Sequence, residues 1–114
     1  MEREGDNRTL QQEAALFAAL ADPTRLRLLQ LLSRQREGHA LCVNALACRL
    51  GVSQPAVSQH LRVLKQVGLV RGQRRGYRVH YFIDAQGLAR CRELANRILR
   101  EPEPKHEEDS KGEG

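Results

Sequence analysis

The sequence predicts one mainly helical domain that carries a single small β-hairpin. Between about residues 9 and 67, apolar side chains recur every three or four positions, as in helices packed on a core. After residue 69 the period changes to two, which is typical of strands. A chain of 114 residues buries only a modest core, so pairing with a second copy would add stability.

Charge divides the chain unevenly. The net charge is +5, but six acidic and two basic residues give residues 101–114 a charge of −4, which leaves +9 on residues 1–100. We expect a disordered N-terminus at 1–8, a folded domain at 9–100 and an acidic disordered tail at 101–114. A folded body this basic suggests a polyanionic partner.

Cap residues divide the first half of the chain into helices. Thr9 and Gln12 fit a capping box, and the helix they begin should end near residue 21. Asp22 caps a second helix, with Pro23 as its first residue, that ends near residue 33. The apolar positions expected in the core are Leu26, Leu29 and Leu31 or Leu32 of that helix, and Val43, Leu46 and Leu50 of a short third helix at 43–50.

Residues 51–68 predict a helix end, a tight turn and a second helix, at about 54–67, with a polar outer face. Gly51 permits the left-handed turn and Ser53 caps the helix that follows. Val57, Leu61 and Leu64 form its apolar stripe. No acidic residue occurs from 52 to 66, whereas an ordinary solvent face mixes Glu with Lys. The side chains expected to contact bases or phosphates are Ser53, Gln54, Ala56, Ser58, Gln59 and Arg62.

Two predicted strands, 69–73 and 77–83, are joined by Arg74, Arg75 and Gly76. A hairpin placed directly after such a helix is a wing, and its two arginines should lie along phosphates or in the minor groove. Asp84 caps a last helix that reaches about residue 100. The predicted order is α-α-(β)-α-α-β-β-α, a winged helix-turn-helix.

Three motifs resemble the arsenical-resistance/metallothionein repressor (ArsR/SmtB) family. Residues 20–29 (LADPTRLRLL) resemble its signature, residues 51–61 and 68–70 its recognition region, and residues 76–81 its wing strand. The resemblance covers about residues 10 to 100. It implies a homodimer, paired through the first and last helices, that binds an inverted-repeat operator in double-stranded DNA until an inducer arrives. The expected dimer-interface residues are Leu16, Leu88, Cys91, Leu94, Ala95 and Ile98.

The inducer site departs from the family pattern. Arsenic- and cadmium-type members of the family carry Glu-Leu-Cys-Val-Cys-Asp-Leu-Cys at the start of the third helix. Here Cys42 matches the first cysteine, Asn44 and Ala47 replace the next two, and Cys48 comes one position late. Residues six apart on a helix point about 240° away from each other, so Cys42 and Cys48 could share a metal only if Cys42 precedes the helix. The histidines of the zinc-type site are absent from residues 84–100.

Cys42, Cys48 and Cys91 are the candidate inducer-sensing residues, and two chemistries stay open for them. One is binding of a thiophilic ion such as arsenite, and the other is oxidation or reaction with reactive sulfur. Cys48 should be exposed and is either reactive or idle, whereas Cys91 should pack in the core. His39 is an alternative third ligand.

The sequence lacks a catalytic constellation, a Gly-rich phosphate loop and a nucleophile elbow, so we do not expect an enzyme. It also lacks a signal peptide and an apolar run of membrane length, which predicts a cytoplasmic protein. The leading hypothesis is a dimeric, sequence-specific transcriptional repressor with thiol sensing. The alternatives are an inducer-independent architectural DNA-binding protein and a winged-helix module for protein interaction.

Overall fold

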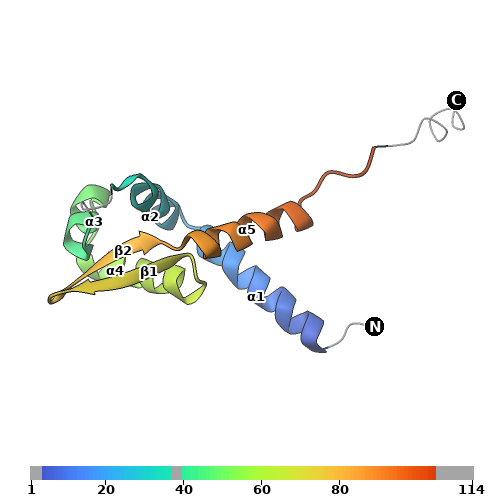
Figure 1. Ribbon diagram of the computed structural model, residues 1–114, viewed down its shortest axis with the longest axis horizontal. Helices are drawn as coiled ribbons and strands as arrows, with labels where there is room; N and C mark the ends of the chain where they lie inside the picture. Colours follow the sequence, from blue (N-terminus) through green and yellow to red (C-terminus); the bar gives the residue numbers. More distant parts are fainter. Residues whose placement is uncertain (1–3, 37–39, 105–114) are drawn as a thin grey trace, which may run out of the picture.

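A computed structural model describes residues 4–36 and 40–104, which form helices and one antiparallel hairpin (Figure 1). The elements are α1 (Glu4–Leu20), α2 (Pro23–Arg34), α3 (Val43–Leu50), α4 (Gln54–Gln66), β1 (Val70–Arg75), β2 (Arg78–Ile83) and α5 (Ala85–Ile98). This order confirms the predicted winged helix-turn-helix. Within the described residues, no helix combines the length and the apolar character that crossing a membrane requires.

The first helix begins earlier than predicted. We expected disorder over residues 1–8 and a cap at Thr9, but α1 already starts at Glu4, so Thr9 lies inside the helix. No proline interrupts residues 4–9, so the helix can extend through them. Residues 101–104 have no regular secondary structure, and the rest of the predicted acidic tail lies outside the described residues.

The core lies where α2, α3 and α4 meet the base of the hairpin and α5. On α4, the predicted stripe of Val57, Leu61 and Leu64 is buried, which confirms that part of the prediction. On α2 the prediction was partly wrong: Leu32 is buried and Leu29 packs against the core, but Leu26 is 47% exposed and Leu28, which was not predicted, is 0% exposed. Five of the seven residues from 26 to 32 are leucine, so the spacing alone did not distinguish the buried face.

Side-chain caps fix the starts of three helices, as predicted. Asp22 Oδ1 accepts hydrogen bonds from the backbone N–H groups of Thr24 (2.9 Å) and Arg25 (3.0 Å). Ser53 Oγ accepts from Ala56 N at 3.2 Å, and the Asp84 carboxylate caps α5. These bonds satisfy amide groups that the first turn of a helix leaves without partners.

The hairpin turn is tighter than predicted. Pairing continues to Arg75 opposite Arg78, so Gly76 and Tyr77 alone make the turn, and Tyr77 is 94% exposed instead of lying in a strand. Gly76 has a φ of 68°, a left-handed conformation that suits a two-residue turn. Because successive residues of a strand face opposite sides, Arg74 and Arg75 lie on different faces of the hairpin.

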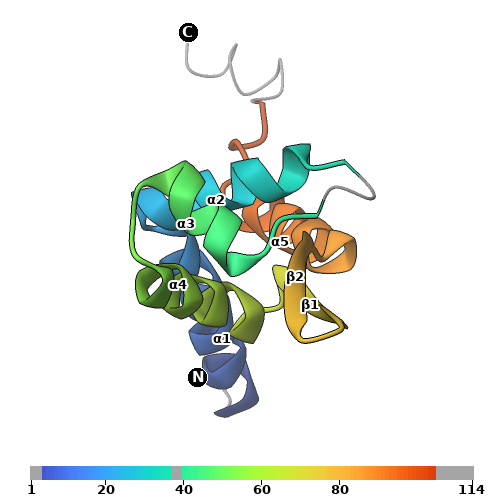
Figure 2. The same ribbon diagram turned by 90° about the vertical axis from the view of Figure 1, so that its left-hand side faces the viewer.

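Close backbone packing holds α5 against the turn that follows α4. A side chain at Gly87 would collide with the carbonyl oxygen of Gly68, and Asp84 N donates to Leu69 O at 2.9 Å. In Figure 2, where the tip of the hairpin faces the viewer, α4 and the two strands lie side by side. The base of the wing is therefore fixed to both neighbouring helices.

Candidate nucleic-acid interface

The outer face of α4 carries three of the predicted DNA-contacting side chains in exposed positions. Ser58, Gln59 and Arg62 are exposed, while the opposite stripe of the helix is buried in the core. A buried stripe holds the helix axis in place, and the exposed side chains remain available to a ligand. Their groups are a hydroxyl, an amide and a guanidinium, which hydrogen-bond base edges and phosphates.

At the start of α4, some of the polar groups already form hydrogen bonds within the protein. The Ser53 hydroxyl is engaged as the cap, and Ala56 is half-buried. Gln54 Nε2 donates to Asn44 Oδ1 at 2.8 Å, which links α4 to α3. An amide has two N–H donors and a carbonyl acceptor, so Gln54 keeps further groups for contact with a base. Sequence reasoning missed Asn44 because its partner lies in the next helix.

Arg25 connects three helices. Its Nε donates to Ala19 O at 2.6 Å and its Nη2 to Ala18 O at 3.3 Å, and both carbonyls belong to the last turn of α1. Its Nη1 lies 3.2 Å from His60 Nδ1 on α4. The hydrogen bond from Arg25 N also lowers the pKa of the Asp22 carboxyl. Sequence reasoning did not identify this role, because nothing local pairs residues 25 and 60.

On the hairpin, two arginines share one aromatic ring. The guanidinium carbon of Arg71 lies 4.8 Å from the centre of the Phe82 ring, and that of Arg75 lies 5.7 Å from it. Arg74, the other arginine predicted for the wing tip, pairs with Val79 on the opposite face. The wing therefore presents positive charge on both of its faces.

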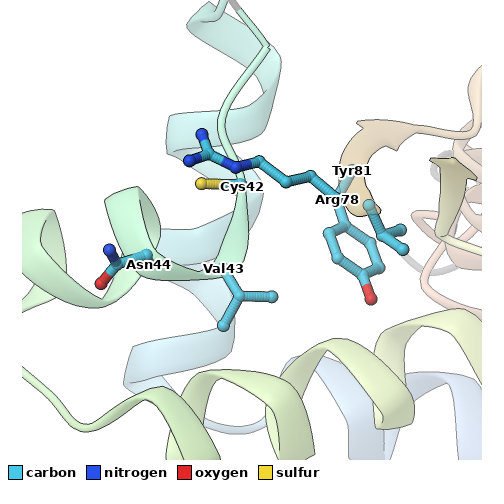
Figure 3. A pocket seen from close by; sticks show the side chains of 6 residues that line it. Cys42, Val43, Asn44, Arg78 and Tyr81 are labelled. Carbon is cyan, nitrogen blue, oxygen red and sulfur yellow. The ribbon is translucent and has the colours of Figure 1, made fainter. Parts of the chain in front are cut away.

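Cys42 lines a pocket of about 340 Å³ beside Asn44, Arg78 and Tyr81 (Figure 3). It is half-buried, occupies the N-cap position of α3 and pairs with His80 of β2 through an isolated antiparallel bridge. The backbone N–H of Ala45 lowers the pKa of the Cys42 thiol most, the N–H of Asn44 and the charge of Arg78 add to this, and partial burial opposes them. This arrangement favours the thiolate, which is the nucleophilic and metal-binding form.

The three cysteines lie in different environments. Cys48 is exposed, as predicted, and Cys91 is buried in the core, where burial raises the pKa of its thiol. Among the side chains that the structure describes, in residues 9–36 and 40–104, no three of His, Cys, Asp or Glu are grouped so that they could hold a metal ion. His39, the alternative third ligand, lies outside the described residues. The donors described within one chain therefore do not fit a preformed metal site.

The candidate dimer-interface residues lie on α1 and α5, which extend away from α3 and the hairpin tip (Figure 1). Leu16 and Leu94 line a hollow of about 390 Å³ between the two helices, where Arg97 lies 3.5 Å from Glu13. Ile98 is 49% exposed, whereas Leu94 is buried. The other expected members are half-buried Leu88 and Ala95 and buried Cys91.

Comparison with known proteins gives consistent matches. Residues 22–71 match the model of the bacterial regulatory protein, arsR family. Over 89 residues the chain is 44% identical to the transcriptional repressor SmtB homolog of Synechocystis, a match that covers 77% of this chain but 64% of the relative, just under two thirds.

Two solved structures are also similar. One, described as a possible transcriptional regulator for arsenical resistance, is 40% identical with a TM-score of 0.65, over 76% of this chain and 85% of its own. The other is a homodimeric winged helix-turn-helix DNA-binding domain from Mycobacterium bovis. It is 29% identical with a TM-score of 0.64, over 92% of this chain and 97% of its own.

Proposed function

This chain belongs to the arsR family of bacterial regulatory proteins, and we propose that it is a homodimeric repressor released from its DNA operator by thiol chemistry. The family consists of DNA-binding transcriptional regulators and not of enzymes. The observation that carries the proposal is the exposed face of α4, where Ser58, Gln59 and Arg62 stand over a buried stripe.

Sequence reading would take place in the major groove. An amide such as that of Gln59 forms two hydrogen bonds with adenine, and a guanidinium such as that of Arg62 forms two with guanine. The face carries no carboxylate between residues 52 and 66 that would repel phosphates. Arg74 and Arg75 would add contacts to the backbone that depend on salt and little on sequence.

Dimerisation would let two copies read an inverted repeat. A twofold pair places its two recognition helices about one turn of DNA apart, which matches two half-sites. The similar Mycobacterium bovis domain is described as homodimeric. In this chain, Ile98 of α5 and Leu10 of α1 are about half exposed, and pairing through these two helices would cover them.

Cys42 is the thiol best placed to sense an inducer. It lines a pocket, lies beside Arg78 and has a lowered pKa, whereas Cys91 is buried with a raised pKa. Because the described donors of one chain do not form a three-ligand site, we favour covalent modification or oxidation of Cys42 over binding to a preformed metal site. Arsenite is the first ion to test, since one similar structure is described as a possible regulator for arsenical resistance.

A gel-shift experiment tests the proposal. The probe is the DNA upstream of the gene for this chain, and a shuffled duplex of equal length and composition is the control. Selective, salt-sensitive binding that arsenite, cadmium, zinc or peroxide reverses supports the repressor. Equal affinity for both duplexes would indicate an architectural protein, and no binding even at low salt would indicate a protein-interaction module.

A further inference from the structure

One face of the hairpin holds a pocket of about 280 Å³ that is separate from the α4 surface. Its lining consists of Gln35, Arg36, Arg71, Gln73, Arg75 and Phe82. The register places Arg71, Gln73 and Arg75 on the opposite side of β1 from buried Val70. The pocket therefore opens on the side of the wing that does not pack on the core.

Positive charge is concentrated in this pocket. Arg71 and Arg75 lie over the same Phe82 ring, and Arg36 approaches from the segment that follows α2. The ion pairs found within the described residues involve none of these three arginines. Like charges that line the same pocket repel one another, and an anion bound among them would relieve that repulsion.

Gln35 fixes the two walls of the pocket relative to each other. Its Nε2 donates to Tyr81 O at 2.7 Å, and its Oε1 accepts from Leu41 N at 2.9 Å. The side chain thus ties the end of α2 to β2 and holds the backbone of the adjacent Arg36 beside the hairpin. The arrangement therefore joins segments that are about 40 residues apart in the sequence. The fold brings these arginines together, whereas the members of an ordinary surface run are simply neighbours in the sequence.

We propose that Arg36, Arg71 and Arg75 form an anion site that binds a phosphate group. Guanidinium groups present paired N–H donors that match the oxygens of a phosphate, and Phe82 holds two of the three in place. The phosphate belongs either to the DNA backbone beside the wing or to a small phosphate-bearing molecule. If the phosphate belongs to DNA, this proposal rests on the proposed function. If it belongs to a small molecule, the proposal is independent of that function, because the pocket lies apart from α4.

Titration of the intact chain with inorganic pyrophosphate tests the site. NMR follows the Nε–H signals of the arginine side chains at low salt, and the test variants are Arg36→Gln and Arg71→Gln. We expect saturable shifts of the pocket arginines, and about tenfold weaker binding in each variant. Arg92→Gln, an exposed charge-matched change on α5, should bind as the wild type does. Non-saturable shifts that are alike in all four proteins would overturn the site.

A second measurement identifies the source of the phosphate. A random-sequence duplex is used, so the result does not depend on any operator. If the site binds the DNA backbone, Arg71→Gln should lower the slope of log K against log salt by about 0.9, the loss of one phosphate contact. An unchanged slope together with weakened pyrophosphate binding assigns the site to a small molecule. If Arg71→Gln and Arg92→Gln have the same pyrophosphate affinity and the same salt slope, the proposal is wrong. This conclusion does not depend on whether the protein selects a particular operator.

Discussion

Arg25 Nη1 lies 3.2 Å from His60 Nδ1, so the start of α2 is joined directly to α4. The same guanidinium donates to two carbonyl oxygens in the last turn of α1. One side chain therefore links the helix that we propose for dimerisation to the helix that we propose for reading DNA.

Replacing Arg25 with methionine should destabilise the fold. The change removes hydrogen bonds from a charged donor to Ala19 O and Ala18 O, and the expected loss in the free energy of unfolding is about 1.5–3 kcal/mol. Urea unfolding measures it, with Arg27→Met, an exposed position on the same helix, as the control. Equal stability of the two variants would show that the Arg25 bonds are not important for the fold.

Gly87→Ala should destabilise the protein by about 1–3 kcal/mol, because the new methyl group would collide with the carbonyl of Gly68 and force α5 away from the wing. Thermal unfolding provides the measurement. Gln86→Ala, at the exposed neighbouring position, should leave stability unchanged or slightly higher because alanine favours helix. A neutral Gly87→Ala would mean that the packing between Gly87 and Gly68 is looser than described.

Local signals in the sequence predicted the order of the helices, the caps of three of them and the buried stripe of α4, but not the start of α1 at Glu4. The spacing of Val57, Leu61 and Leu64 fits only one buried face of a helix. The cap residues Asp22, Ser53 and Asp84 each accept hydrogen bonds from backbone amides within three residues. In the leucine-rich α2, the spacing fits more than one buried face, so the exposure of Leu26 could not be predicted.

Contacts between segments that are distant in the sequence could not be predicted from such local signals. The pair of Arg25 and His60, the proximity of Cys42 and Arg78, and the stacking of Arg71 on Phe82 depend on how the helices and the hairpin pack. No spacing rule connects such residues. The composition of the candidate interface could therefore be predicted from the sequence, but its geometry could not.

Operator reading should depend on Gln59 and Arg62. If each forms a bidentate contact with a base, Gln59→Ala and Arg62→Ala should each weaken specific binding by about 1–3 kcal/mol and affect a shuffled duplex much less. Fluorescence anisotropy on both duplexes measures the difference. Lys65→Ala, an exposed change near the end of α4, is the control for a simple loss of charge. An equal loss on both duplexes would restrict the residue to phosphate contact.

Ile98→Glu should weaken dimerisation more than tenfold, because a carboxylate would be buried where α1 and α5 are proposed to meet a second copy. Sedimentation equilibrium gives the dissociation constant, and operator affinity should fall with it. Gln86→Glu adds the same charge at the start of α5, where it should leave the dimer intact. A wild-type protein that is monomeric at micromolar concentration would contradict the proposed assembly.

Thiol reactivity should separate Cys42 from Cys91. The pKa of Cys42 is lowered and that of Cys91 is raised, so as pH rises Cys42 should become thiolate, and react with iodoacetamide, before Cys91 does. Mass spectrometry of the alkylated peptides gives the rate at each cysteine against pH. Arg78→Gln should move the Cys42 profile to higher pH, because it removes a positive charge that stabilises the thiolate, while the Cys91 profile should not change.

The same thiol should be required for release from DNA. Cys42→Ser keeps a small polar side chain at the N-cap of α3, so the variant should bind the operator as the wild type does but should not leave it when the inducer is added. Cys48→Ser is the matched control, since this exposed cysteine lies outside the pocket. If a variant with all three cysteines replaced by serine still responds fully in cells, the signal does not act through thiols, and the lowered pKa of Cys42 is only a consequence of its N-cap position.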